Sequence, residues 1–376
     1  MEILDRYINE LIEKSTPQAP IWNIEQIRSG KPSKWNYIDG CMIKALIELY
    51  HITKEQKYLD FADNFIDYFV QDDGSIKSYK PEELNIDNVN AGKTLFDLYE
   101  LTGKEKYRKA IDTIYGQVKM QPRTKEGNFW HKKIYPWQVW LDGMYMGQPF
   151  YMQYEVMYNN CENCKDSVKQ FENVHRIMRD EKTGLYYHGY DESREMYWAD
   201  KETGLSQNFW LRALGWYAMA LVDTIDIMPD SLAEDRDKLK AIYVEYVDAL
   251  LKYQDESGMW YQVADQGGRE KNYLETSGSA ILAFAIMKSV RLGILPEEYF
   301  KFGEKAFNGI CDKYLSEENG ELQLGGICLV AGLGGNSYRD GSYEYYMSEP
   351  VVKNEAKGVA PLILAYTEIL HKELNR

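Results

Sequence analysis

The sequence predicts an all-α fold, an (α/α)6 barrel of six helical hairpins that occupies residues 1–376 as one domain. Three observations predict it: a gapless internal repeat, glycine-containing turns that recur roughly every 50 residues, and six segments that begin polar and continue apolar. No Pro/Gly/Ser-rich linker interrupts the 376 residues. The length could hold two ordinary domains, but closed helical barrels also run this long as one unit.

The repeat aligns residues 46–58, LIELYHITKEQKY, with residues 95–107, LFDLYELTGKEKY. In both copies an amphipathic segment ends, a polar turn containing Thr follows, and a second amphipathic segment begins. Ile43, Leu46, Ile47 and Tyr50 have the i, i+3, i+4, i+7 spacing of one helical face. Each copy is therefore expected to be a helical hairpin.

Similar turns follow the hairpins at residues 73–76, 126–131, 183–188, 257–262 and 319–322, each expected as a turn with a short extended piece. Between them, inner helices with glycine near their starts are expected to begin near Asp39, Asn90, Asp142, Arg212, Ser277 and Lys357. An open array is the alternative to a closed ring. We favour the ring, because closure brings the polar starts together at one end.

Composition limits the partners. A formal net charge of −15 argues against non-specific nucleic-acid binding, which needs a basic surface. An anionic ligand would instead need a local cluster of Arg, Lys or His. The 9 Trp and 31 Tyr either fill the core or stack on ring-shaped ligands, and by themselves they favour the core.

Residues 1–14 indicate an acidic amphipathic helix without the basic start of a signal peptide. No window approaches the roughly 18 apolar residues that span a membrane. A cytoplasmic location without membrane contact is therefore expected. Five cysteines argue against a disulfide framework, and Cys161 and Cys164 are expected to be two unpaired thiols, because structural zinc needs four ligands.

The starts of the inner helices also carry most of the chemistry-bearing residues. These are Trp35, Tyr37, Asp39, Asp87, Asn90, Trp140, Asp142, Trp210, Arg212, Trp216, Glu275, Ser277, Asn354 and Lys357. Asp142 stands among aromatic residues, where a carboxylate loses hydration and its protonated form is favoured. That setting suits a general acid. The alternative is that Asp142 only caps its helix.

His131 and His188 each follow an aromatic residue in a glycine-containing turn. With the tryptophans, Arg212 and Lys132, they would form a cationic, aromatic pocket suited to a carboxylated sugar ring. Residues 332–336, GLGGN, lack the Walker Gly-Lys-Ser/Thr and are expected to form a loop, either over the site or beneath it. No metal or organic cofactor is predicted.

Several motifs occur in a fixed order: residues 130–132 (WHK), 135–136 (YP), 140–147 (WLDGMYMG), 209–217 (FWLRALGWY), 273–279 (YLETSGS) and 330–336 (VAGLGGN), the last followed by DGSYEYY. From about Trp35 to about Tyr366 the chain thereby resembles glycoside hydrolase family 105, the unsaturated rhamnogalacturonyl hydrolases. The resemblance implies an (α/α)6 barrel. It also implies removal of the 4,5-unsaturated galacturonyl residue from the non-reducing end of lyase-generated rhamnogalacturonan oligosaccharides.

The resemblance implies roles for particular residues. Asp142 matches the general acid/base, and Asp87 matches a second carboxylate that orients substrate or water. The positions that resemble sugar-binding ones are Tyr37, His131, Lys132, Met146, His188, Trp210, Arg212 and Trp216. The implied reaction protonates C4 of the enol ether and adds water at C5. Ordinary glycosidases instead need two carboxylates beside the scissile bond.

Two other functions remain open on the sequence. One is a related unsaturated glucuronyl hydrolase acting on glycosaminoglycan or ulvan fragments, since pocket residues rather than the fold decide the substrate. The other is a non-catalytic, helical sugar-binding scaffold. For either hydrolase, rhamnogalacturonyl or glucuronyl, the expected partner is a small oligosaccharide that carries a terminal unsaturated uronate.

Overall fold

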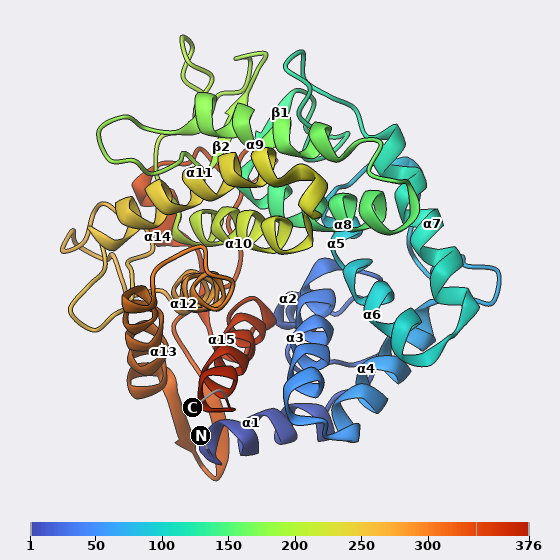
Figure 1. Cartoon of the computed structure of the whole chain (residues 1–376). Coiled ribbons are helices and arrows are strands. Elements are labelled where there is room, and N and C mark those ends of the chain that lie inside the picture. Colours follow the sequence, from blue (N-terminus) through green and yellow to red (C-terminus); the bar gives the residue numbers. More distant parts are fainter. Residues whose placement is uncertain (1, 336, 375–376) are drawn as a thin grey trace.

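A closed ring of inner helices forms the centre of the protein in a computed structural model that describes residues 2–335 and 337–374 (Figure 1). The helices in order are α3 (Tyr37–Thr53), α5 (Asp87–Asn90), α6 (Lys93–Thr102), α8 (Leu141–Tyr158), α10 (Leu211–Ile227), α12 (Thr276–Arg291) and α15 (Ala356–Leu374). From α8 to α15 each inner helix contacts the next, α15 contacts α3, and α3 contacts α5 and α6, of which α5 contacts α8. The ring therefore closes and the open array is excluded.

The outer helices surround this ring, each packed on the inner helix that precedes it in the chain. They are α4 (Gln56–Phe69), α7 (Glu105–Met120), α9 (Cys164–Met178), α11 (Ala233–Leu251) and α13 (Phe300–Tyr314). The partner of α15 comes from the other end of the chain, because Tyr366 donates a hydrogen bond to Asp5 on α1 (Glu2–Glu13) at 3.0 Å. The predicted barrel is confirmed, with its last helix pair formed by the two ends of the chain.

Short elements connect the helices. The helical ones are α2 (Ile24–Ser29), α14 (Tyr343–Ser348) and the 3-10 turns η1 (Pro81–Glu83), η2 (Asp230–Leu232) and η3 (Glu297–Tyr299). The strands pair antiparallel as β1 (Gln138–Trp140) with β2 (Gly189–Asp191), β3 (Leu315–Glu318) with β4 (Glu321–Leu324), and β5 (Ile327–Cys328) with β6 (Val351–Val352). The glycine-containing turns are confirmed: Gly74, Gly127, Gly184 and Gly258 have φ between +75° and +103°.

Neighbouring inner helices begin at the same end of the barrel, which we call the site end. A Cβ atom on Gly40 would lie 2.6 Å from the Cα of Ala91, and one on Gly278 would lie 2.9 Å from the backbone carbonyl carbon of Leu211. Only glycine leaves room for approaches this close. The prediction that small residues let the helix starts meet is confirmed at both positions.

Ion pairs join the inner helices towards their other ends. Lys44 on α3 lies 2.6 Å from Asp97 on α6, and Lys288 on α12 lies 2.9 Å from Asp223 on α10. These pairs are largely buried, so each would leave an uncompensated charge if one partner were removed. They hold the ring together away from the site end.

The prediction for Cys161 and Cys164 was wrong, because the structure joins them in a disulfide. They lie where the chain turns from α8 to α9, and this turn brings their Cα atoms to 5.0 Å, within the range that a disulfide spans. The sequence spacing alone did not specify that turn. Separately, none of the helices in the described residues is long and apolar enough to cross a bilayer.

Replacing Gly40 with Ala should destabilise the barrel, because the added Cβ meets backbone atoms of Ala91 that cannot move aside cheaply. We expect the free energy of unfolding to fall by about 1–3 kcal/mol, as for other overpacked sites. Urea denaturation measures this change. Gly116→Ala on outer helix α7 is the matched control, because no atom lies within 4 Å of its added Cβ. A loss no larger than that of the control would contradict the close-approach argument.

Candidate active site

A short antiparallel ladder brings His188 to the start of α8. Trp140 on β1 pairs with Gly189 on β2. The next residue, Leu141, donates its backbone N–H to the carbonyl of His188 at 3.1 Å. Residues almost 50 positions apart in the chain therefore lie side by side at the first turn of α8, where Asp142 is found.

Backbone bonds place Asp87 beside the segment that carries His131 and Lys132. Ile86 N–H donates to the carbonyl of His131 at 3.1 Å, and Lys133 N–H donates to the carbonyl of Leu84 at 3.1 Å. This short pairing precedes α5, so Asp87 at the start of α5 faces the side chains of the paired segment. The same segment is bonded to β1 through His131 N–H and the carbonyl of Gln138 at 2.8 Å.

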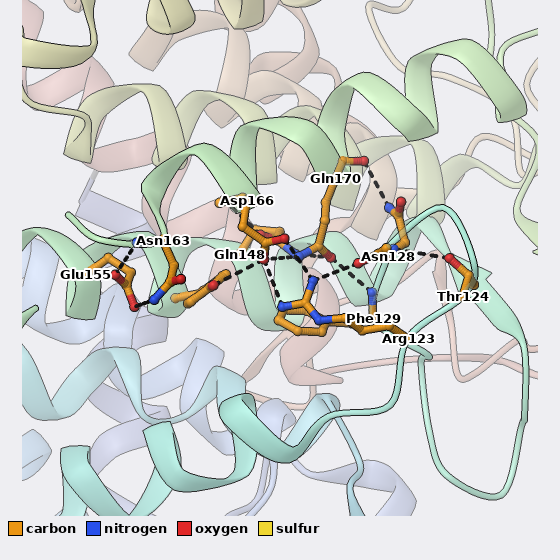
Figure 2. A network of polar contacts seen from close by, with 12 residues as sticks. Arg123, Thr124, Asn128, Phe129, Gln148, Glu155, Asn163, Asp166 and Gln170 are labelled. Carbon is orange, nitrogen blue, oxygen red and sulfur yellow. Dashed lines mark hydrogen bonds and ion pairs between the residues drawn. The ribbon is translucent and has the colours of Figure 1, made fainter.

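A polar network fixes this segment onto α8 and α9 (Figure 2). The side-chain oxygen of Gln170 accepts hydrogen bonds from the Phe129 N–H at 3.0 Å and from the Gln148 amide at 2.9 Å. Arg123 binds Asp166 through both terminal nitrogens, at 2.9 and 2.8 Å. Together these hydrogen bonds and this ion pair fix the backbone just before His131 in one position.

Asp142 is not used as a helix cap. The cap residue of α8 is Trp140, which makes no side-chain capping bond, and the buried Oδ2 of Asp142 has no hydrogen-bond partner among the described residues. Other acids at the site end are saturated. Asp39 accepts from Trp22, Asn23 and Asn36, and Glu275 caps α12 through two backbone N–H groups. The capping alternative is therefore excluded for Asp142.

His188 is the polar group nearest to Asp142. Its Nε2 lies 3.2 Å from Asp142 Oδ2, and its ring is completely buried. Trp140 meets this ring edge-to-face at a centroid distance of 5.5 Å, and Trp210 lies at 4.8 Å. A carboxylate and an imidazole thus face each other within an aromatic shell that excludes water on that side.

Asp87 is paired, in contrast to Asp142. Lys132 Nζ lies 2.7 Å from one carboxylate oxygen, and His131 Nε2 lies 3.3 Å from the other. Burial alone would raise the pKa of Asp87, but the ammonium of Lys132, through its charge and its hydrogen bond, outweighs burial and holds this pKa below its usual value. Burial lowers the pKa of His131 to about 4, so this imidazole is neutral at neutral pH.

The ring of Trp140 contacts both imidazoles that face the acids, His131 beside Asp87 and His188 beside Asp142. It stacks on His131 at a centroid distance of 4.5 Å and an angle of 14°, and on Tyr135 at 5.2 Å and 15°. A Cβ on Gly143 would lie 2.8 Å from His131 Nδ1, so the glycine after Asp142 makes room for this ring. The aromatic residues near Asp142 therefore order the site as well as fill it.

Arg212 carries a buried charge that no carboxylate pairs. Its guanidinium donates to Ser277 Oγ at 3.1 Å and to the carbonyls of Cys328 at 2.5 Å and Leu329 at 3.4 Å, and it lies 4.8 Å from the ring centre of Trp210. No carboxylate of the described chain lies within 4.0 Å of it. Its positive charge thus remains available to a ligand.

Tyr37 is within electrostatic reach of the same groups. Burial, followed by the negative charges of Glu25 and Asp87, raises the pKa of its hydroxyl well above the usual value, while Arg212 opposes that change. Tyr37 begins α3, so it approaches Asp87 and Arg212 from another side of the ring.

Met146 and Trp216 lie one helical turn deeper. Met146 follows Asp142 by four residues on α8, and Trp216 follows Arg212 by four residues on α10, so each shares a helix face with the site residue above it. Both are buried, and Trp216 stacks on Tyr145 at 4.7 Å. Their contact with a sugar stays a prediction.

Tyr346 was not among the predicted site residues. Its hydroxyl lies 2.8 Å from His188 Nδ1, and its ring is nearly parallel to that of Trp210, at 17°. It lies on α14, after the glycine-rich segment, of which Asn336 is outside the described residues. Sequence spacing could have suggested a helix from Tyr343 to Tyr346 but not that it reaches His188.

The described residues contain no cluster of three or more His, Cys, Asp or Glu that could hold a metal ion. The groups brought together at the site end are instead a carboxylate with an imidazole, a carboxylate paired with an ammonium, and a buried guanidinium, among aromatic rings. Acids, cations and aromatic faces are the groups with which proteins bind and hydrolyse acidic sugars.

Similarity to known proteins agrees with this arrangement. The family model of Glycosyl Hydrolase Family 88 matches residues 10–372. A family 105 glycoside hydrolase of C. acetobutylicum ATCC 824 is 44% identical, with a TM-score of 0.90, over 98% of each chain. The chain belongs to the glycoside hydrolases that this family model describes and, among them, to family 105.

Two further relatives are similar over part of the chain. Protein Atu3128 of Agrobacterium fabrum is 42% identical over 234 residues, which are 60% of this chain and 98% of that protein. Unsaturated rhamnogalacturonyl hydrolase YesR of Bacillus subtilis is 29% identical over 213 residues, which are 54% of either chain. The resemblance to family 105 found in the sequence is thus confirmed.

Replacing Lys132 with Met should destabilise the fold, because it leaves the buried carboxylate of Asp87 without its ammonium partner. In the wild type the pKa of Asp87 is below its unfolded value, so this carboxylate stabilises the fold at neutral pH and loses that effect as the pH falls through the folded pKa. Without Lys132, burial would raise the pKa of Asp87. We expect a loss of about 3 kcal/mol at neutral pH, which shrinks towards about pH 4.

Urea denaturation at the two pH values tests this expectation. Lys133→Met is the matched control, because the neighbouring Lys133 is exposed and makes no ion pair with a described residue. Equal losses for the two variants, or a loss that does not depend on pH, would show that Lys132 does not balance the charge of Asp87.

Proposed function

We propose that the whole chain is one catalytic domain that removes a 4,5-unsaturated galacturonyl residue from the non-reducing end of rhamnogalacturonan oligosaccharides. Membership of a glycoside hydrolase family supports the reaction class. The name of the partial relative YesR favours a rhamnogalacturonan substrate over a glucuronide.

The proposal rests on the surroundings of the Asp142 carboxyl group. Among the acids at the starts of the inner helices, Asp39 and Glu275 are saturated by donors and Asp87 is paired with Lys132. Asp142 alone of these four acids has an oxygen that is buried, beside an imidazole, and free of any hydrogen bond in the described structure. An acid left in this state can both give and take a proton.

A single acid of this kind is enough for the enol ether of an unsaturated uronate. Protonated Asp142 gives its proton to C4, which leaves an oxocarbenium-like centre at C5. Water adds at C5 and gives a proton to the Asp142 carboxylate, which restores the acid. The resulting hemiketal opens by cleavage of the C5–ring oxygen bond, and the hemiacetal left at C1 expels the aglycone. Asp87, held ionised, orients substrate or water.

Recognition of the uronate carboxylate is assigned to Arg212. Its guanidinium contacts a hydroxyl and carbonyl oxygens, so its charge is not neutralised within the site. Charge-assisted hydrogen bonds from Arg to a carboxylate are among the strongest that a protein offers. The rings of Trp210 and Tyr37, with His131 and Lys132, would surround the sugar, and Met146 and Trp216 would lie below it.

The reaction is tested by following the ultraviolet absorbance of the unsaturated uronate, which disappears when water adds to the double bond. We expect loss of absorbance with the lyase-generated rhamnogalacturonan disaccharide and much slower loss with unsaturated chondroitin or ulvan disaccharides. Faster loss of absorbance with the glucuronides would indicate that the protein is an unsaturated glucuronyl hydrolase. No loss with any of these compounds would favour a sugar-binding scaffold.

Asp142→Asn should abolish turnover while the substrate still binds, because the amide keeps the shape of the carboxyl group but gives no proton. We expect kcat to fall by about 10²- to 10⁴-fold. Calorimetric titration with the uncleaved disaccharide measures binding. Asp39→Asn is the matched control, since Asp39 begins α3 but is held by Trp22 and Asn23, and kcat should change little. Substantial turnover by Asp142→Asn would remove Asp142 from the acid/base role.

A further inference from the structure

A buried hydrogen bond lies behind the proposed acid. The hydroxyl of Tyr346 and Nδ1 of His188 are 2.8 Å apart, and both side chains have no exposed surface. On the opposite edge of the imidazole, Nε2 faces Asp142 Oδ2 at 3.2 Å. Tyr346, His188 and Asp142 therefore form a line from α14 to the start of α8.

The direction of the hydrogen bond follows from the number of donors. The hydroxyl of Tyr346 has no other hydrogen-bond partner in the described part of the chain, and a buried donor without an acceptor is costly. If Nδ1 carried the proton, it would donate to the tyrosine oxygen and the hydroxyl hydrogen would have no acceptor. The hydroxyl must therefore donate to Nδ1, which leaves the imidazole proton on Nε2.

This tautomer directs an N–H donor at Asp142. Within the described residues neither oxygen of Asp142 has a hydrogen-bond partner, and Oδ2 is buried whereas Oδ1 is not. Nε2 and Oδ2 are 3.2 Å apart but do not have the alignment of a hydrogen bond, so the N–H acts on Oδ2 through its partial positive charge. A partly positive hydrogen beside Oδ2 disfavours a proton on that oxygen, so the acidic proton resides on Oδ1, the oxygen that is not buried.

We propose that Tyr346 is a positioning residue for the reaction: it fixes His188 as the Nε2–H tautomer, so that an N–H and not a lone pair faces Oδ2 of Asp142 and keeps the transferable proton on Oδ1. The inference rests on the proposed function, in which Asp142 is the acid/base. The hydroxyl of Tyr346 also polarises the imidazole and strengthens the Nε2–H donor. The carboxylate formed when Asp142 gives up its proton is thereby stabilised.

Other charged and titratable groups face these three residues. Lys132, His131 and Arg212 act on Asp142 from the 130–137 segment and from α10. Tyr345, Cys328 and Asp340 lie around Tyr346. All of these groups remain when only the hydroxyl of Tyr346 is removed. A change in the pH dependence of kcat on that removal is therefore due to the contact between Tyr346, His188 and Asp142.

Tyr346→Phe is the test, because it keeps the ring that packs beside Trp210 and deletes only the hydroxyl. Without this donor, Nε2–H is weaker and Asp142 is a weaker acid. We expect kcat to fall about tenfold, the rate equivalent of one hydrogen bond, with KM nearly unchanged. The alkaline limb of the kcat profile should move to higher pH, by up to about one unit.

Tyr343→Phe is the matched control. It removes a hydroxyl from the same helix, one that donates to the carbonyl of Glu270 at 2.8 Å and not to His188. It should leave kcat and its pH profile as in the wild type. If Tyr346→Phe also keeps both, or if the two variants lower kcat equally without moving the profile, the proposal is wrong.

A second measurement does not depend on activity. Nitrogen-15 NMR of the imidazoles, with His188→Gln used to assign one of the 5 histidines, reports the tautomer of His188 directly. We expect a protonated Nε2 and an unprotonated, hydrogen-bonded Nδ1 in the wild type. In Tyr346→Phe the Nδ1 signal should shift as the bond is lost. A protonated Nδ1 in the wild type would overturn the proposal, even if no substrate is turned over.

The double variant shows whether Tyr346 acts through His188. In the His188→Gln background, Tyr346→Phe should have no further effect on kcat, because the residue through which it acts is absent. A further tenfold loss there would assign Tyr346 a separate role and contradict the proposal. Failure of the wild type to consume any unsaturated uronide, with the expected NMR signals present, would reject the proposed function and not the tautomer.

Discussion

The site depends on the closure of the inner ring, and closure depends on how closely the helix starts approach one another. At Gly40 and Gly278 the neighbouring backbone leaves no room for a Cβ atom. Inner helices that meet this closely at one end bring their first turns together, with the polar residues that begin them. Pairing of α15 with α1 at the two ends of the chain completes the barrel (Figure 1).

If only the helix starts met, their acids would be saturated by backbone N–H groups, as Glu275 is. Short extended segments between the helices bring the other side chains of the site to these acids. The β1–β2 pair carries His188 to α8, and the pairing of residues 84–86 with residues 131–133 carries Lys132 to Asp87. Because backbone hydrogen bonds fix these positions, the side chains meet with little freedom left to lose on binding a substrate.

Charge is distributed unevenly over the site, and this distribution separates the roles. Asp87 is compensated by Lys132, so it is held ionised and suits orientation. Arg212 is buried, and no carboxylate in the described part of the chain pairs with it, which suits the binding of an anion. Asp142 faces the imidazole of His188 within an aromatic shell, and no ammonium or guanidinium of the described residues pairs with it, which suits proton transfer. A site with two paired carboxylates would lack this asymmetry.

The sequence by itself determined the barrel, the starts of its inner helices and most of the residues that gather there, because helical periodicity, turn glycines and motif order are local properties of the chain. It could not decide whether Asp142 was a cap, since that depends on which donors approach it. It missed the Cys161–Cys164 disulfide, which depends on the turn between two helices. Tyr346 was reached only through tertiary structure, because its contact with His188 spans 158 residues of sequence. Distances between segments so far apart are set by the closure of the ring, and no local pattern records them.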